Sequence, residues 1–358
     1  MVRSLLSLAT PWQREPCGCT QSQRPTTQAN PLVLDATDLK STLNHRAAKS
    51  AIAASGYRLS LGAEPPTVPA RAIMLNFRPE DCLTPEEKSA FESQGFLVIK
   101  DVLPEARAVE LEHAVDALHR RVLDAGYDPY TKKAITSQDV FFLSNVLHRD
   151  PAFLHLIDWH RTFPKVWGIL GWNIACYHSH FLINPALTGS AKQSPLGWHQ
   201  DSGRVNRDLE GELRPRLSLK VGFYLSDCSA PGRANTWVVP GSHLKNNLDV
   251  PADGSLPKGA IPVLVKRGDA LFFDRRLFHA GSPNVSEITR KVVFYGYGYR
   301  WLRPKDNMTV SDDMLYFSDP IRRQLLGATT DFNAYFSPNE VDVPLRSFLR
   351  EHFGDQFE

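Results

Sequence analysis

The segment Pro195-Leu196-Gly197-Trp198-His199-Gln200-Asp201-Ser202 carries the pattern on which the interpretation of this chain depends. Alternate residues of a β-strand point to the same side, so a strand here places the imidazole of His199 beside the carboxylate of Asp201. Two histidines and one carboxylate on one face form a metal site that suits non-haem Fe(II) and leaves coordination positions open. This segment supplies two of the three ligands, and the rest of the chain has to supply the third.

A second copy of the His-x-Asp pattern lies at His148 and Asp150, so the pattern by itself is weak evidence for a metal site. The apolar residues across 139–170 predict a helix there. Residues i and i+2 of a helix point about 200° apart, so a helix cannot place both side chains on one metal ion. We therefore expect a metal site at the first copy and none at the second.

Three further motifs follow the first copy in the chain. Gly268-Asp269 is a tight turn that leads into the apolar run Ala270–Phe273. His279 ends the next run, where a second imidazole can complete the metal site. Arg290 follows eleven residues later, and its guanidinium can form two parallel hydrogen bonds with a carboxylate. The turn Pro240-Gly241-Ser242-His243 closes another apolar run.

The hydrophobic pattern changes from helical to β-type near Asn173. Before it, Thr84 and Glu87 form a helix-capping pattern, Phe96–Ile99 predicts a short strand, and Pro104 opens a second helix. After it, short apolar runs alternate with Gly, Pro, Asn and Asp, at 174–183, 217–225, 237–239, 261–265, 270–273 and 291–299. This arrangement predicts a mainly β protein in which helices pack on one side of a jelly-roll or barrel-like double sheet.

Taken in order, these motifs resemble the phytanoyl-CoA dioxygenase family of Fe(II)- and 2-oxoglutarate-dependent oxygenases, over about residues 83–303. The resemblance implies a double-stranded β-helix (jelly-roll or cupin-like) core, Fe(II) as the metal, and 2-oxoglutarate and O2 as co-substrates. It implies that the catalytic triad His199, Asp201 and His279 binds iron, and that Arg290 holds the far carboxylate of 2-oxoglutarate. The residues expected to line the pocket beside them are Trp198, Gln200 and Phe223.

The resemblance also implies a reaction, in which an unactivated C–H bond of a small-molecule substrate is hydroxylated with release of succinate and CO2. Asp201 fills the position that halogenases on this fold leave open for halide, which argues against halogenation. Two other functions stay open: a catalytically silent jelly-roll module that binds a small molecule, and a zinc hydrolase that uses the same triad. The first would form no succinate, and the second would have no use for Arg290. The identity of the substrate does not follow from the sequence.

Composition sets the remaining bounds. Of the 358 residues, 42% are hydrophobic and 22% are charged, which is typical of a globular protein, and the net charge of +2 argues against a nucleic-acid partner. No apolar run is long enough to span a membrane. Five cysteines without a CxxC pair favour reduced thiols and a cytoplasmic location, while the arginines of the first 30 residues also resemble an organelle transit peptide. The oligomeric state is not indicated.

We expect three parts along the chain. Residues 1–72, rich in Ser, Thr, Pro and Gln, are predicted to be a flexible N-terminal tail. Residues 73–305 form the predicted dioxygenase domain. Residues 306–358 are predicted to be a C-terminal extension that packs on or beside this domain.

Overall fold

The computed structural model describes residues 77–128, 131–186, 196–209, 211–212, 214–306, 311–316 and 318–357. The predicted tail, residues 1–72, therefore lies outside the described residues. The described chain begins with a helical turn, η1 (Pro79–Asp81), and helix α2 (Pro85–Gln94). The predicted capping pattern is present, because the Thr84 hydroxyl accepts from the Glu87 N–H and the Glu87 carboxylate accepts from the Thr84 N–H.

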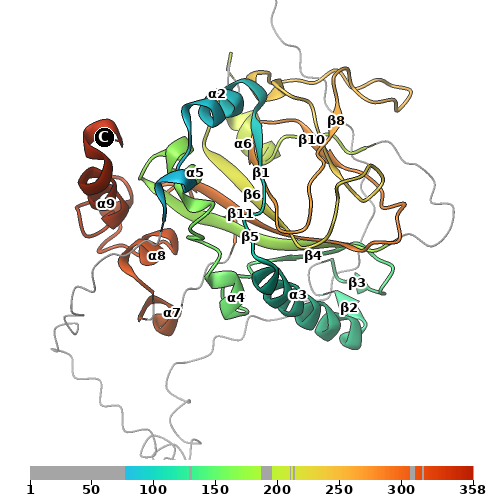
Figure 1. Ribbon diagram of the computed structural model, residues 1–358, viewed down its shortest axis with the longest axis horizontal. Helices are drawn as coiled ribbons and strands as arrows, with labels where there is room; N and C mark the ends of the chain where they lie inside the picture. The colour runs from blue at the N-terminus through green and yellow to red at the C-terminus, as the bar shows by residue number, and fades with distance from the viewer. Residues whose placement is uncertain are drawn as a thin grey trace, which may run out of the picture. The chain divides into compact units, whose positions relative to one another are not determined.

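Six antiparallel strands form the main sheet, in the spatial order β1-β9-β6-β11-β5-β4 (Figure 1). Their bounds are β1 (Phe96–Ile99), β4 (Phe141–Ser144), β5 (Ile174–Asn184), β6 (Ser218–Tyr224), β9 (Ala270–Asp274) and β11 (Arg290–Tyr299). Chain neighbours are seldom sheet neighbours here, because the chain passes from one sheet to the other four times between β6 and β11. This connectivity is what closes a jelly roll.

A second, three-stranded sheet has the order β10-β7-β8, with β7 (Thr236–Val238), β8 (Ile261–Pro262) and β10 (His279–Gly281). A hairpin of β2 (Tyr127–Asp128) and β3 (Lys133–Ala134) stands apart from both sheets. Val238 of the small sheet shares one apolar cluster with Tyr224, Phe273 and Phe294 of the large one. The two sheets therefore face each other across a common interior, and the predicted mainly β, double-stranded β-helix fold is confirmed.

Side chains of the large sheet alternate between this interior and a layer of helices. On β6, Leu219, Val221 and Phe223 join the core on the helix side, whereas Tyr224 belongs to the interior cluster. The helices of this layer are α3 (Glu105–Ala125), α4 (Pro151–Leu154) and α5 (Phe163–Leu170). Tyr295 connects β11 of the large sheet to α4 of this helix layer, because its hydroxyl donates to the Phe153 carbonyl at 2.7 Å. The predicted packing of helices on one side of the double sheet is therefore present.

The prediction of a helix across 139–170 is wrong for the first half of this segment. Residues 141–144 form the edge strand β4, which pairs with β5, and only α4 and α5 are helical. An apolar run as short as Phe141-Phe142-Leu143 fits either period, and here the free edge of β5 takes it as a strand. The second His-x-Asp copy lies in the turn that follows, where the Asp150 carboxylate caps α4 by accepting from the Ala152 N–H at 2.8 Å.

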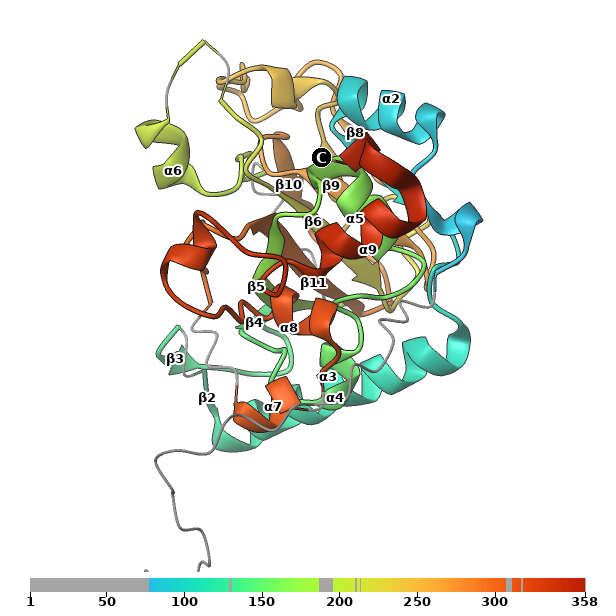
Figure 2. The same cartoon turned by 90° about the vertical axis from the view of Figure 1, so that its left-hand side faces the viewer.

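The C-terminal residues pack on the outer side of α5 and β5. Their elements are α7 (Asp312–Tyr316), α8 (Pro320–Leu325), η3 (Asn333–Tyr335), α9 (Pro344–Phe353) and η4 (Gly354–Phe357), and Figure 2 shows α8 and α9 in front of the large sheet. Phe348 lies edge-on to Trp167 of α5, and Arg322 pairs with the buried Asp158 at 2.7 Å. Within the described part of the chain, none of the helices combines the length and the apolar character that crossing a membrane requires.

The Pro240–His243 turn leads into η2 (Ser242–Leu244) and holds the small sheet against the end of α2. The Gly241 N–H donates to the Gln94 carbonyl at 2.9 Å, and the buried His243 donates through Nε2 to the Glu92 carbonyl at 3.0 Å. Gly95, which ends α2, has a φ of +81°, and a Cβ built on it would lie 2.5 Å from Nδ1 of His243. Close approach and backbone conformation both require glycine at this position.

A comparison of Gly95 with Gly126 separates the requirement for space from the requirement for a positive φ. Gly126 ends α3 with a φ of +64°, and a Cβ there would meet nothing within 4 Å. Gly126→Ala should lower the free energy of unfolding by about 1 kcal/mol, the cost of the left-handed backbone alone. Gly95→Ala should cost about 1–3 kcal/mol more, because it also overpacks the His243 ring. Chemical denaturation of both variants measures the difference, and equal losses would mean that His243 moves aside freely.

Candidate metal site and 2-oxoglutarate pocket

Three predicted ligands meet at one point, where Asp201 and His279 are buried and His199 is exposed. The candidate ligand atoms of His199, Asp201 and His279 all lie within 4.8 Å of one another. Two backbone hydrogen bonds of 3.0 Å join residues 199 and 279 in both directions, so that their rings stand 4.3 Å apart. The segment before Asp201 is a single β-bridge rather than a regular strand, but the alternation of its side chains is the predicted one. In the described residues, no other group of three or more His, Cys, Asp and Glu side chains has this spacing.

Backbone carbonyls orient both imidazoles. Nδ1 of His199 lies 2.9 Å from the Gly197 carbonyl, and Nδ1 of His279 lies 2.9 Å from the Leu277 carbonyl. A carbonyl only accepts, so each Nδ1 carries the proton and each Nε2 keeps its lone pair for a metal. Burial lowers the pKa of His279 to about 4, although the charge of Asp201 opposes the shift. His279 is therefore neutral at pH 7, as a ligand must be.

Asp201 offers one oxygen to a metal and one to a lysine. Its Oδ1 accepts from Lys220 Nζ at 2.9 Å, whereas its Oδ2 is buried and has no hydrogen-bond partner in the described structure. Burial alone would raise the pKa of Asp201, but the charge of Lys220 and its hydrogen bond hold it below its usual range. Two neutral imidazoles and one unpartnered carboxylate oxygen are the donor set that suits a divalent iron ion.

Arg290 lies at the start of β11, 3% exposed. Its Nη1 donates to the Asn184 side chain at 2.9 Å, its Nη2 donates to Thr236 Oγ1 at 3.2 Å, and its guanidinium lies over the ring of Tyr224. Each of these partners is neutral, and its Nε has no partner among the described residues. A buried cation with a free donor fits a carboxylate, so the pocket has the chemistry that 2-oxoglutarate needs.

Two of the three residues predicted to line the pocket do not face it. Gln200 lies between the ligands His199 and Asp201 in sequence, so strand alternation turns its side chain away from the metal site. Its amide donates to the Lys245 and Arg276 carbonyls. Phe223 packs edge-on against Tyr295 in the core on the helix side. Trp198 is half-buried in the segment before His199. The assignments of Gln200 and Phe223 to the pocket are therefore corrected.

Two further residues face the interior, Lys220 and His180. Lys220 is a single cation in the otherwise apolar run Leu217–Leu225, at even spacing from Tyr224, which is the parity of the interior face. This pattern was visible in the sequence. His180 stacks on Phe294 of the interior cluster, and burial lowers its pKa well below the usual value.

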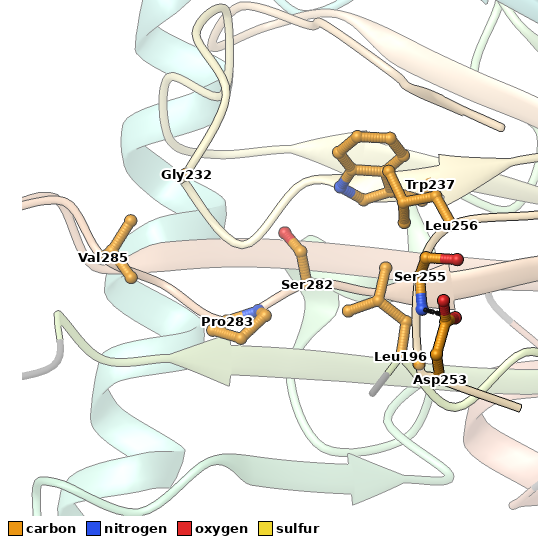
Figure 3. Close-up of a pocket in the computed structure, with 10 residues that line it drawn as sticks. Leu196, Gly232, Trp237, Asp253, Ser255, Leu256, Ser282, Pro283 and Val285 are labelled. Carbon is orange, nitrogen blue, oxygen red and sulfur yellow. Dashed lines mark hydrogen bonds between the residues drawn. The ribbon is translucent and has the colours of Figure 1, made fainter. Parts of the chain in front are cut away.

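A cavity of about 610 Å³ lies elsewhere (Figure 3). It is lined by residues such as Leu196, Trp237 and Ser282, and by none of the triad. On β7, the flanking Thr236 and Val238 point into the interior, so alternation places Trp237 on the outer face of the small sheet. This cavity therefore opens on the opposite side of the sheet from the candidate metal site.

Comparisons with known proteins bear on the same residues. The model of the phytanoyl-CoA dioxygenase (PhyH) family matches residues 91–292, which is more than half of the chain and includes the triad and Arg290. Similar solved structures include HygX from Streptomyces hygroscopicus with nickel and 2-oxoglutarate bound, at 18% identity and a TM-score of 0.49 over 65% of this chain and 94% of that one. They also include EctD from S. alaskensis in its apoform, at 19% identity and a TM-score of 0.49 over 61% and 77% of the two chains.

A search of curated proteins gave no match. The conclusion on family therefore depends on the family model. Members of that family use Fe(II) as the metal and 2-oxoglutarate and O2 as co-substrates, and the donor set described above fits all three. By the extent of the match, the chain belongs to the phytanoyl-CoA dioxygenase (PhyH) family of Fe(II)- and 2-oxoglutarate-dependent oxygenases.

Proposed function

We propose that this protein hydroxylates an unactivated C–H bond of a small-molecule substrate, with His199, Asp201 and His279 as the iron ligands. The balanced reaction takes substrate, 2-oxoglutarate and O2 to hydroxylated substrate, succinate and CO2. The observation that carries the proposal is the combination of three convergent ligand atoms within 4.8 Å with a buried, uncompensated guanidinium at Arg290. When bound, the iron supplies the activation of O2 that the side chains of this chain cannot provide.

The protein's own residues have distinct parts in this proposal. The carbonyls of Gly197 and Leu277 hold the two imidazoles in the tautomer that ligates through Nε2. Lys220 keeps Oδ1 of Asp201 occupied, so that this carboxylate offers only Oδ2 to the metal. Arg290 holds the far carboxylate of 2-oxoglutarate, and Asn184 and Thr236 fix the plane of its guanidinium.

Joint binding of metal and co-substrate is the first prediction. Fe(II) and 2-oxoglutarate added together without oxygen should give a broad visible absorption band, because the keto acid chelates the metal. Admission of O2 should then produce succinate. Mg²⁺ in place of Fe(II) serves as the control and should give neither signal. Binding of 2-oxoglutarate with equal affinity in the absence of any metal would contradict chelation, and a protein without succinate formation would be a binding module or a hydrolase.

The two His-x-Asp copies provide a matched pair for the second prediction. Asp201→Ala should abolish both tight Fe(II) binding, measured by anaerobic calorimetry, and succinate formation, because a charged ligand is lost. Asp150→Ala should leave both unchanged and lower the free energy of unfolding by about 0.5–2 kcal/mol, because it removes only a helix cap. Asp201→Ala also leaves the Lys220 ammonium buried and unpaired. Metal binding is therefore measured well below the melting temperature of each variant. The opposite ranking of the two variants would move the site to the second copy.

The third prediction concerns Arg290. Arg290→Ala should raise the KM for 2-oxoglutarate by tenfold or more, since loss of a buried, charge-paired partner costs about 2–5 kcal/mol. Arg290→Lys should restore part of the affinity, because an ammonium keeps the charge but not the paired donors. Affinity for Fe(II) alone should not change.

Arg300 supplies the control for this variant. It is also buried, and its guanidinium donates only to the Ala334 and Ala328 carbonyls near the C-terminal helices. Arg300→Lys should therefore leave the KM for 2-oxoglutarate unchanged. If Arg290→Ala weakened Fe(II) and 2-oxoglutarate binding equally, Arg290 would have a structural role.

A further inference from the structure

A second cavity, of about 420 Å³, adjoins the triad on the side of Asp201. Ser202, which follows Asp201, forms part of its wall. Arg275 forms another part, and its carbonyl accepts from the Asp201 N–H at 2.9 Å. Tyr177 lines it from β5, and burial and then the charge of Asp201 raise the pKa of its hydroxyl. The cavity and the candidate metal site therefore share a wall.

Arg275 is a buried cation that forms no ion pair among the described residues. It is 1% exposed, its Nη1 donates to the Asn206 side chain at 2.5 Å, and its Nη2 donates to the Pro215 carbonyl at 3.0 Å. Both acceptors are neutral, and its buried Nε has no partner in the described structure. The next residue, Arg276, differs because it pairs with Asp274 at 2.8 Å. The fold thus pairs one of two adjacent arginines with a carboxylate and leaves the other, which lines the cavity, without an ion pair in the described structure.

Two more cations line the same cavity after β11. They are Arg303 and Lys305, and within the described residues neither has an acidic side chain within ion-pair distance. Burial and the charge of the nearby Lys220 lower the pKa of Lys305, although Asp201 and Asp306 oppose this. Like charges are therefore close enough here to repel one another.

The acids near the cavity have other partners. Asp306 is buried against His178, with 2.6 Å between Oδ1 and Nδ1, and also accepts from the Ser179 N–H. Asp201 is bound by Lys220. Arg204 also lines the cavity, but Asp208 pairs with it at 2.8 Å, so it adds no free charge. Among the described residues, Arg275, Arg303 and Lys305 remain without an ion pair.

We infer that this cavity binds an anionic group of the primary substrate, a carboxylate or a phosphate, and so presents the attached carbon skeleton to the metal site. The inference rests on the proposed function for the reaction, but the anion-binding cavity stands on its own contacts. Arg275, Arg303 and Lys305 give this cavity positive charge, and Leu217 and Leu302 give it apolar walls for a carbon chain. A neutral substrate would leave the buried Arg275 guanidinium without an ion-pair partner.

Calorimetry on the full-length protein tests the inference with simple probes. The protein is held anaerobic with Fe(II) and saturating 2-oxoglutarate, so that the Arg290 pocket is filled, and is titrated with inorganic phosphate, hexanoate and neutral hexanol. We expect one site for phosphate or hexanoate and no binding of hexanol at the same concentration. The stronger of the two anions indicates which group the substrate carries.

Three lysine variants locate the site. Lys305→Met should weaken anion binding by tenfold or more, and Lys305→Arg should restore it, because only the charge is required. Lys258→Met, which removes an exposed lysine far along the chain from this cavity, should bind the anion as the wild type does. All three should keep the wild-type KM for 2-oxoglutarate. Unchanged affinity in Lys305→Met, hexanol binding equal to that of hexanoate, or no anion binding at the highest soluble concentration would overturn the inference.

The same titration without metal or 2-oxoglutarate separates this inference from the proposed function. If the protein bound no 2-oxoglutarate but still bound the anion in a Lys305-dependent manner, the proposed reaction would fail and the cavity would stand. If 2-oxoglutarate turnover were normal but the anion did not bind, the reaction would stand and the substrate class would be wrong.

Discussion

The pair of backbone hydrogen bonds between His199 and His279 is the constraint on which the site depends. These residues are 80 positions apart in the chain, and no regular strand connects the first of them to the sheet. The bridge sets the register, and the register alone decides which side chains point inward. A slip of one residue would turn both histidines outward and bring Gln200 into the interior. A strand as short as β10 is therefore sufficient to place His279, because the bridge to His199 fixes its register.

Much of the fold and the convergence of the triad could be predicted from the sequence because both follow local periodicity. The capping pattern at Thr84 and the apolar runs of β5, β6 and β11 are signals contained within one element. The prediction failed at Phe141–Ser144, where the sequence fits two periods and the free edge of β5 decided between them. It also failed for Gln200 and Phe223, where a family expectation was followed although strand alternation argued against it.

The cavity lined by Arg275, Arg303 and Lys305 could not be predicted from the sequence, for a different reason. Tyr177, Ser202, Arg275 and Lys305 come from four separate parts of the chain, and no spacing in the sequence connects them. Whether an arginine is compensated depends on which acid the fold places beside it. Arg275 and Arg276 are neighbours of the same type, yet only one has a carboxylate partner. Such a difference exists only at the level of tertiary structure, which is why charge patterns in sequence say little about binding sites.

The contact between Lys220 and Asp201 has a consequence for the folding of the protein before it binds iron. A carboxylate buried with two neutral imidazoles and no cation would be costly to keep ionised, and the empty protein would be strained or unfolded. The lysine balances that charge at 2.9 Å, so folding does not have to wait for the metal. The chain can therefore fold before it binds iron.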